Sequence, residues 1–373
     1  MTNTRLSIPY MSPFMGCDPE FFFKSKGRVI GSEKLINSET GFTPKITGNH
    51  GAHTAAAGTV SKVIVDGVQA ELNPRPNTCR ANLANEIGAI FRGLHKTMEE
   101  SGQGHIKMDF SQTVNISKTE LSKLDEKNQK FGCSPSLNSY KDTGAKLAEV
   151  DPTQFRGRSA GGHIHIGSKN YSGLEAAIKS NPDRVVEFLD ILCGNTCVLI
   201  DRDAGNRARR KLYGRAGEYR LPSHGIEYRT LSNFWLTAYP LMSLAFGMAR
   251  FAVDMASSKD ADKFYNLLTS KVSMEDVRKA INTNNFKLAY KNFKAIESII
   301  LEYAHGSDHT GLDKTVIKEF HHFVATVKDH GLSYWFKQDP MSHWMALEEA
   351  HAGGISDFLK NVVRKDMNKT KSP

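Results

Sequence analysis

Four short segments alternate polar and apolar residues, which predicts β-strands with one polar face. They span residues 18–20, 69–73, 163–166 and 225–229. Because alternate side chains of a strand share a face, each segment should present two polar residues on one side. These are Asp18 and Glu20, Glu71 and Asn73, His163 and His165, and Glu227 and Arg229. The residues between them are apolar apart from a tyrosine hydroxyl. The pattern therefore predicts one sheet face lined by carboxylates, histidines and an arginine.

Further apolar runs complete the expected strands. Residues 19–23 and 63–68 are strand-like, and Asp66-Gly67 suits a hairpin turn that leads into the segment 69–73. Residues 226–231 form the last clear strand. The region 105–150 is expected to hold a strand followed by a long loop.

Helical periodicity predicts the elements that cover the sheet. Apolar residues recur at helical spacing over 82–99, and Asn181-Pro182 opens a second helix that runs to about residue 200. Ser273 with Asp276 is typical of a capping box. The apolar stretch 234–248 is shorter than the roughly 20 residues that cross a membrane, so a buried helix is expected there.

The order of these elements predicts an α+β fold. Strands and helices mix over the N-terminal two-thirds, whereas the chain beyond about residue 236 is helical throughout. Regular helices do not separate the strands, which disfavours a doubly wound parallel sheet. We expect a catalytic domain over residues 1–240 and a helical region over 241–373 packed on it, with a basic tail from about residue 360.

Charge and composition narrow the class of protein. The chain has 373 residues, 39% of them hydrophobic, and a formal net charge of +9, which suits a folded enzyme with anionic ligands or a nucleic-acid binder. The five cysteines lack zinc-like spacing, and Cys193 and Cys197 suit helix packing, so a reducing cytoplasm is expected. A dense basic run between residues 201 and 229 comprises Arg202, Arg207, Arg209, Arg210, Lys211, Arg215, Arg220 and Arg229.

The polar face has the chemistry of a site for hard metal ions. Carboxylate oxygens with one imidazole suit Mg²⁺ or Mn²⁺, whose shells are completed by waters and phosphates. Zinc at His163 and His165 is the alternative, but it requires further nitrogen or sulfur donors. For any one segment, a solvated charged face explains the pattern about as well, and only the recurrence in all four argues against it.

Part of the basic run suits a polyphosphate clamp beside that site. Arg210, Lys211 and Arg215 precede the Glu227 strand and are followed by glycines at 214 and 217. Guanidinium groups match phosphate oxygens, and glycine allows close backbone approach. A surface charge cluster is the alternative reading. The sequence contains neither a Walker-type loop nor a dinucleotide fingerprint, and Gly161-Gly162 is only a weak glycine signal.

Six stretches resemble the glutamine synthetase-like superfamily of amide-forming ligases, and within it the phage-type COOH–NH₂ ligase branch. They are GCDPEFFF (16–23), DGVQAELNPRP (66–76), FGCSPSLNSY (131–140), RSAGGHIHIG (158–167), RRKLYGRAGEYR (209–220) and GIEYRTLSNFWL (225–236). They follow the family's order across residues 16 to 236. Residues beyond 240 carry no comparable motif.

The resemblance implies a curved antiparallel sheet with its active site on the concave face and helices outside. It implies that Glu20, Glu71 and Glu227 ligate divalent metal, together with a histidine. A glycine-rich turn before the histidine favours His163, and the His-x-His pair of other relatives keeps His165 open. Relatives carry Glu-x-Glu where this chain has Asp18, so Asp18 is expected to reach metal through water.

The resemblance also implies roles for the arginines and a two-step reaction. Arg210, Arg215 and Arg229 match in spacing the arginines that bind ATP phosphates and the phosphorylated intermediate; His165 and Lys211 complete the candidate nucleotide site. A carboxylate would attack ATP to give an acyl phosphate, which an amine would convert to an amide. Mg²⁺ or Mn²⁺ and ATP are the implied cofactors.

Alternatives to this reaction stay open. Guanidino kinases share the sheet, and a silent basic nucleic-acid-binding protein would share the charge. The carboxylate and amine substrates are not specified by the sequence; Asn138 and Tyr140 are candidate substrate-loop residues. A homodimer, a nucleic-acid partner and a phage origin in host cytoplasm are compatible expectations, and no membrane association is expected.

Overall fold

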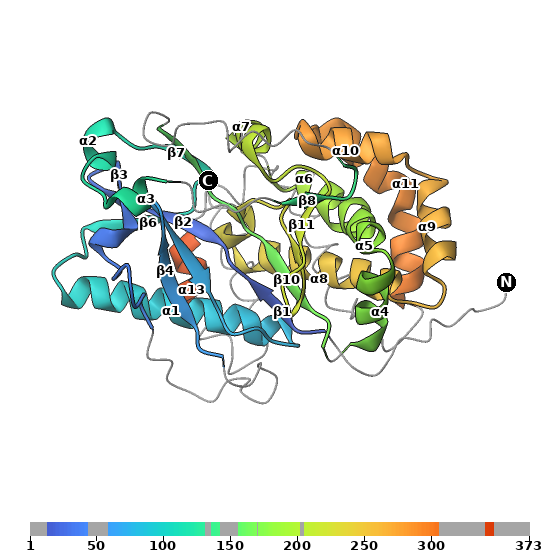
Figure 1. Ribbon diagram of the computed structural model, residues 1–373, viewed down its shortest axis with the longest axis horizontal. Coiled ribbons are helices and arrows are strands. Elements are labelled where there is room, and N and C mark those ends of the chain that lie inside the picture. Colours follow the sequence, from blue (N-terminus) through green and yellow to red (C-terminus); the bar gives the residue numbers. More distant parts are fainter. Residues whose placement is uncertain are drawn as a thin grey trace, which may run out of the picture.

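A computed structural model describes residues 13–43, 59–130, 136–141, 156–169, 171–201, 205–305 and 340–346. It combines antiparallel sheets with a larger share of helices (Figure 1). The expected α+β class is therefore confirmed. The predicted basic tail, the motif residues 131–135 and Arg202 lie outside the described residues.

Two five-stranded sheets form the centre of the molecule. The first sheet has the order β1-β10-β12-β11-β8, and in the second sheet the order is β3-β2-β5-β4, with β6 also paired to β2. Every strand pairing in them is antiparallel. The first sheet comprises β1 (Met15–Cys17), β10 (Ile164–Gly167), β12 (Gly225–Tyr228), β11 (Glu218–Arg220) and β8 (Leu137–Asn138). The second comprises β3 (Arg28–Ile30), β2 (Glu20–Ser25), β5 (Gln69–Asn73), β4 (Lys62–Asp66) and β6 (Ile106–Asp109).

One continuous segment joins the two sheets. The chain leaves the first sheet at Cys17 and enters the second at Glu20, so Asp18 and Pro19 lie between the two ladders. Pro19 has no N–H to donate to a ladder, but its carbonyl accepts from the Leu72 N–H at 3.0 Å. The expected continuous strand over residues 18–20 is thus interrupted, and the polar face continues from one sheet to the next. A third, two-stranded sheet pairs β7 (Thr113–Asn115) with β9 (Gly157–Ser159).

Alternation along the strands separates a polar face from an apolar one, as predicted. The residues that alternate with the polar positions have side chains 0% exposed: Phe21, Ala70, Leu72, Ile164, Ile166, Ile226 and Tyr228. They join one continuous hydrophobic core with the helices. The hairpin between β4 and β5 is also confirmed, with Asp66 opposite Gln69 and Gly67 at φ +63°.

Helices cover the apolar side of both sheets. The predicted helix over residues 82–99 is α1 (Arg80–Glu100), and the buried apolar stretch forms a 3₁₀ turn (Asn233–Thr237) followed by α8 (Tyr239–Ala256). Helix α8 packs against α1 and against α5 (Pro182–Leu189). Within the described residues, no helix combines the length and apolarity that a membrane crossing needs.

The helix that begins at Pro182 contains a π-helical turn. Its segments are α5, the π turn Asp190–Gly194 and α6 (Asn195–Val198), so the expected helix to about residue 200 is confirmed with a local irregularity. Cys193 and Cys197 are buried there, with their Sγ atoms 3.9 Å apart. Asn181 caps the helix by accepting from the Arg184 N–H at 3.1 Å.

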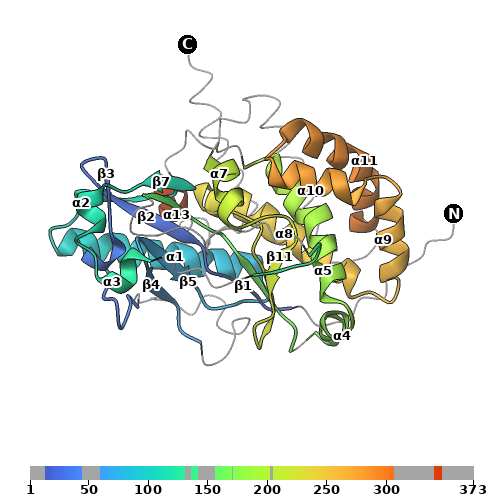
Figure 2. The ribbon, with the colours of Figure 1, turned by 45° about the horizontal axis from the view of Figure 1, so that its top comes forward.

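The remaining helices flank this core. Helices α9 (Ala261–Thr269), α10 (Met274–Asn282) and α11 (Phe286–His305) gather at the end of the molecule opposite the second sheet (Figures 1 and 2). Ser273 is the N-cap of α10, because its hydroxyl accepts from the Asp276 N–H at 3.1 Å; this is one of the two hydrogen bonds of the expected capping box. The shorter helical elements are η1 (Ser32–Lys34), α2 (Lys118–Leu121), α3 (Glu126–Gln129), α4 (Ser172–Ser180), α7 (Gly205–Leu212) and α13 (Pro340–Ala346).

Candidate active site

Six acidic and histidine side chains converge where the two sheets meet. They form two groups of three. Within each group, the ligand atoms all lie within 4.8 Å of one another. We name Asp18, His165 and Glu227 the mixed group, and Glu20, Asp66 and Glu71 the carboxylate group. The strands position them: Glu20 lies opposite Glu71, and His165 lies opposite Glu227. Because Asp18 lies two residues before Glu20, which begins β2, the two groups are neighbours.

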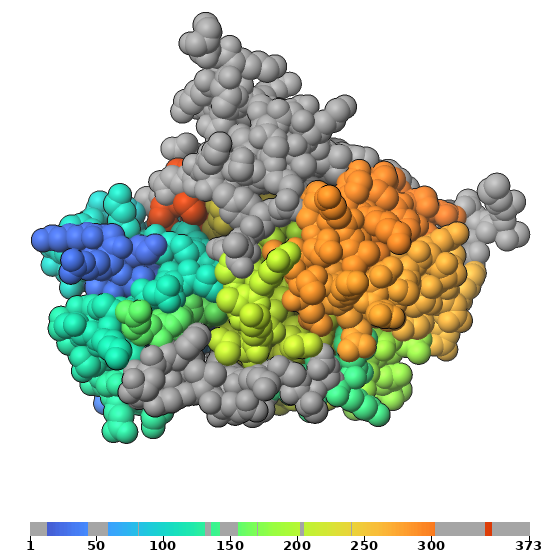
Figure 3. Space-filling view, turned by 90° about the horizontal axis from the view of Figure 1, so that it is seen from above, coloured from blue at the N-terminus to red at the C-terminus, as the bar shows by residue number. Residues whose placement is uncertain are grey.

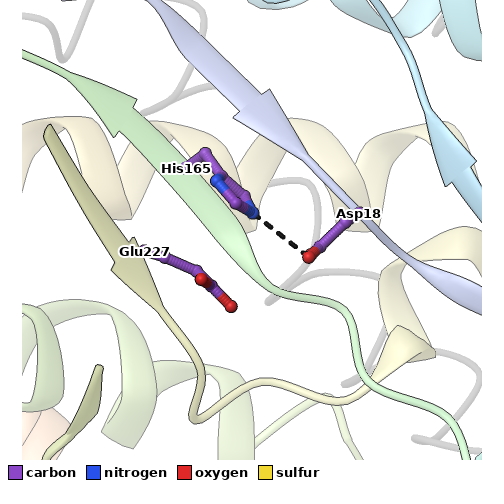
Figure 4. A group of neighbouring side chains, drawn as sticks. All are labelled: Asp18, His165 and Glu227. Carbon is purple, nitrogen blue, oxygen red and sulfur yellow. Dashed lines mark ion pairs between the residues drawn. The ribbon is translucent and has the colours of Figure 1, made fainter. Parts of the chain in front are cut away.

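Asp18 contacts both histidines of the site. Its Oδ2 lies 3.2 Å from His165 Nε2 (Figure 4), and its Oδ1 lies 3.2 Å from His163 Nδ1. His163 Nδ1 is also 3.5 Å from Glu227 Oε1. Both histidines therefore direct a ring nitrogen to the same carboxylate, and His163 lies against the mixed group as well.

Backbone packing fixes the Gly-Gly-His turn beside this group. Gly161 donates its N–H to Glu20 Oε2 at 2.6 Å, and its carbonyl accepts from the Glu20 N–H at 2.9 Å. A Cβ on Gly161 would come within 2.6 Å of His163 Nε2, and one on Gly162 within 2.4 Å of the Ser232 carbonyl. The two glycines thus allow His163 and Glu20 to approach the turn, which gives the weak sequence signal a structural cause.

The carboxylate group is dominated by like charges. Glu20 is buried, and Asp66 and Glu71 are half-buried. Hydrogen bonds reach two of them: Tyr213 Oη donates to Glu20 Oε2 at 3.3 Å, and Asn73 Nδ2 to Glu71 Oε1 at 2.9 Å. Burial, followed by the neighbouring carboxylates, raises the pKa of Glu20 and Glu71 well above the ordinary glutamate value. The pKa of Asp66 is also raised, mainly by burial.

The mixed group has a different electrostatic balance. Burial opposes ionisation of Asp18, but the charges of His163 and His165 hold its pKa far below the ordinary value. Burial opposes charge on His165 too, yet Asp18 raises its pKa overall. Burial prevails at Glu227, whose pKa it raises, and at the adjacent His163, whose pKa it lowers.

Two arginines face Glu227. Arg220 lies opposite Glu227 in the β11–β12 ladder, with Nη1 3.5 Å from Glu227 Oε2. Arg229 Nε lies 3.5 Å from Glu227 Oε1, which confirms that the two residues share a face. Arg229 is buried, whereas the Arg220 side chain is 32% exposed. The Arg220 charge also lowers the pKa of Asp66, so this guanidinium lies near both groups.

Two of the predicted phosphate-clamp residues, Arg210 and Lys211, lie in different surroundings. Arg210 is buried, and burial lowers its pKa to about 10 despite the opposing charge of Asp201 and, more weakly, of Tyr228 and Asp190. Tyr228 alternates with Glu227 and therefore lies on the opposite face of β12. Lys211 is exposed at the end of α7. In Figure 3, the yellow-green surface that includes α7 lies between the orange surface of α10–α11 and the teal and blue surface of earlier residues. The nucleotide roles of Arg210 and Lys211 stay predictions.

Arg215 and its neighbour Arg209 differ in their surroundings. Arg215 is half-buried, and its charge is one of the smaller influences on Glu218. Arg209 is 0% exposed and donates to the carbonyls of Arg229, Thr230 and Leu231 at 2.7–3.2 Å. Arg209 therefore holds the end of β12 in place. The phosphate role of Arg215 stays a prediction.

The candidate substrate-loop residues Asn138 and Tyr140 make hydrogen bonds within the fold, and their substrate role stays a prediction. Asn138 Nδ2 donates to the Ala216 carbonyl at 3.0 Å. Tyr140 Oη donates to Asp190 Oδ2 at 2.9 Å, on the side of the sheet where Tyr228 lies. The partners in these two hydrogen bonds lie outside the mixed group and the carboxylate group.

The sequence patterns missed three residues of the site. Asp66 was placed only in a hairpin turn, His224 lies in the β11–β12 loop, and Tyr213 reaches Glu20 from beyond α7. An alternation signal was available for Asp66 alone, because Lys62, Ile64 and Asp66 share one face of β4 opposite Glu71 and Gln69. His224 and Tyr213 come from loops, whose positions follow from tertiary packing.

The donor set fits hard divalent ions. The carboxylate group offers oxygen only, and the mixed group offers oxygen and one imidazole nitrogen, as Mg²⁺ and Mn²⁺ prefer. The buried atoms His165 Nε2 and Glu227 Oε1 make no hydrogen bond, although charged partners lie 3.2 and 3.5 Å away. Atoms in this state are suited to coordination. Among the described residues, no cysteine joins either group.

The structure thus combines an antiparallel α+β fold with two acidic groups on a sheet face and two arginines beside them. Residues 147–309 match the model of the family described as "Phage phiEco32-like COOH.NH2 ligase-type 2". The match confirms the resemblance to phage-type carboxylate–amine ligases. It contains His163, His165, Glu227 and Arg229, crosses residue 240 and ends beyond α11.

Comparison with other proteins adds little to this family match. A solved structure titled "Apo GmaS without ligand" shares 12% sequence identity, covers 88% of this chain and 73% of that chain, and has a TM-score of 0.34. No curated protein sequence matches the chain. The fold class therefore rests on the sheets described above, and the domain boundary at residue 240 stays a prediction.

Proposed function

We propose that the chain is an ATP-dependent ligase that joins a carboxylate to an amine through an acyl phosphate. The observation that carries the proposal is the convergence of the mixed and carboxylate groups beside Arg220 and Arg229, within a chain whose family is named for carboxylate–amine ligation. Asp18, Glu20, Asp66, Glu71, His165 and Glu227 would hold the divalent ions, with His163 adjacent. Bound Mg²⁺ or Mn²⁺ would neutralise charge on the phosphates of ATP.

The protein side chains would act mainly by electrostatics and positioning. Arg220 is partly exposed and lies near both groups, so it can reach phosphate oxygens held above them. Arg229 is buried beside Glu227, where a fixed guanidinium would stabilise charge that develops during phosphoryl transfer. Preorganised donors of this kind lower the barrier because they need no reorientation during the reaction.

The reaction would proceed in two displacements. A substrate carboxylate oxygen attacks the γ-phosphorus of ATP, the bond to the β–γ bridging oxygen breaks, and ADP leaves. The amine nitrogen then attacks the acyl carbon, phosphate leaves with its bonding electron pair, and the nitrogen loses a proton. The products are an amide, ADP and phosphate.

Hydroxylamine provides a direct test of the acyl phosphate, because it reacts with that species to give a hydroxamate. We would incubate the protein with ATP, Mg²⁺ and a panel of carboxylates, with hydroxylamine in place of the amine, and measure ADP and hydroxamate. Equal amounts of both products are expected, with neither formed in chelator. ADP release that yields a stable phosphorylated guanidino compound instead would identify a phosphotransferase and refute the ligase assignment.

A matched pair of arginine variants tests the site. Arg220→Ala should reduce hydroxamate formation by about 10²–10³-fold, since it removes a donor aimed at the transferring phosphate. Arg184 is similarly exposed, at 34%, but stacks on the Tyr265 ring at 3.6 Å, so Arg184→Ala should leave the rate nearly unchanged. Equal effects of the two substitutions would contradict the assignment of Arg220 to the site.

A further inference from the structure

His224 makes a direct contact with the mixed group that the proposed reaction does not use. Its Nε2 lies 3.0 Å from His165 Nδ1, and the two rings are tilted by 32° with centroids 5.2 Å apart. The opposite nitrogen of His165, Nε2, faces Asp18 at 3.2 Å. His165 is therefore held between a carboxylate on one side and a second imidazole on the other.

The loop that carries His224 is fixed by its backbone. The His224 carbonyl accepts from the Ser168 N–H at 2.8 Å, and the Gly225 N–H donates to the Pro222 carbonyl at 3.0 Å. Gly225 has φ +152°, and a Cβ there would come within 2.1 Å of the Ile166 carbonyl. These contacts hold an exposed histidine at the C-terminal end of β10, where its ring meets that of His165.

The contact between the two rings determines which nitrogen of His165 can bind a metal. A neutral imidazole carries one hydrogen, so Nε2 can act as a ligand only when the hydrogen is on Nδ1. Nδ1 then donates, and the nitrogen it faces must accept. His224 Nε2 can accept when the His224 hydrogen is on Nδ1. Asp18 cannot perform this function, because it faces the nitrogen that would bind.

We propose that His224 is a positioning residue that holds His165 as the Nδ1–H tautomer, with Nε2 directed to a divalent ion shared with Asp18 and Glu227. The inference rests on the proposed metal site and deepens it, because it selects His165 Nε2 as a ligand and gives its ring an outer partner. Outer partners that orient ligand histidines typically contribute 10- to 100-fold in metal affinity.

Calorimetric titration with Mn²⁺ alone tests the proposal in the full-length protein. His224→Ala should weaken binding at one of the two groups by about 10-fold or more and leave the other group unchanged. His224→Gln should restore much of the affinity, because its amide oxygen can accept. His224→Lys should not, because an ammonium group only donates. Ser223→Lys, at the neighbouring exposed position, controls for the added charge.

A second measurement reports the tautomer without using activity. Long-range ¹H–¹⁵N spectra of histidine-labelled protein in Mg²⁺ should show His165 as the Nδ1–H form in the wild type and a mixture in His224→Ala. Wild-type Mn²⁺ affinity in His224→Ala, or equal rescue by Gln and Lys, would overturn the role of His224 alone. Absence of Mn²⁺ binding by the wild type would overturn both this inference and the proposed function.

Discussion

Buried carboxylates lie on both faces of the first sheet, and their partners differ. On the helix side, Asp190 accepts from Tyr228 Oη at 2.6 Å and from Tyr140 Oη at 2.9 Å. Asp201, also buried, accepts from the side chains of Gln112, Asn206 and Ser232. The site face instead groups carboxylates with one another, and Glu227 Oε1 makes no hydrogen bond.

This difference separates acids that serve the fold from acids available to a ligand. A buried carboxylate with several donors is satisfied by the protein and stabilises its surroundings. Converging carboxylates repel one another and favour protonation unless a cation neutralises them. Substitutions on the site face should therefore mainly reduce activity, whereas substitutions on the helix side should mainly reduce stability.

The largest effect is expected on the site face. Glu227→Ala should reduce ATP turnover with a competent substrate by at least about 10²-fold, because it removes a ligand from the mixed group. Circular dichroism and thermal unfolding should show a folded protein, since this carboxylate lacks the donor network that stabilises Asp190. Near wild-type turnover in this variant would show that the metal assignment is wrong.

On the helix side, Asp190→Ala should lower the free energy of unfolding by about 3 kcal/mol, because the hydroxyls of buried Tyr228 and half-buried Tyr140 lose their acceptor. Urea denaturation followed by circular dichroism measures this change. Asp183 provides a matched control: it accepts one tyrosine hydroxyl, from Tyr219 at 2.8 Å, and is only half-buried. Asp183→Ala should cost about 1 kcal/mol or less; an equal cost would mean that burial of the network contributes little.

The pH dependence of stability should distinguish the two faces further. Burial raises the pKa of Asp190 to about 7 and raises the pKa values of Glu20, Glu71, Asp66 and Glu227. A raised native pKa means that the folded state binds more protons, so stability falls as pH rises from about 4 through the native pKa values.

Thermal unfolding in chelator should therefore show a declining midpoint between pH 5 and pH 8. Mg²⁺ should recover the part that arises on the site face, and the recovery should be larger at pH 8 because protons compete with the metal. The part of the decline that arises from Asp190 should remain in Mg²⁺, and Asp190→Asn should remove it. A midpoint that rises with pH in chelator would contradict the raised carboxylate pKa values.

The smallest expected effect is a gain in stability. Glu71→Gln removes one of three converging charges and keeps an oxygen that can accept from Asn73. The metal-free variant should be more stable than the wild type by on the order of 1 kcal/mol at pH 8, while its Mn²⁺ affinity falls. Destabilisation in chelator would indicate that repulsion in the carboxylate group is weak.

Strand alternation in the sequence predicted most of this site. It assigned Asp18, Glu20, Glu71, His163, His165, Glu227 and Arg229 to one face because a strand's period is short and local. The same alternation placed the intervening apolar residues in the core, and helical periodicity, which is also local, located the helices that cover them. It also gave the hairpin at Asp66 without indicating that the carboxylate would join Glu20 and Glu71.

Tertiary structure alone decided how these residues are grouped. Pro19 interrupts the ladder, so Asp18 joins His165 and Glu227 whereas Glu20 joins Asp66 and Glu71.

Packing also placed Arg210 among the charges of Asp201 and Asp190, and brought His224 to His165 from a loop. Composition and spacing identify an arginine or a histidine as chemically suitable. Which face it occupies and which atom it meets depend on contacts between residues far apart in the chain.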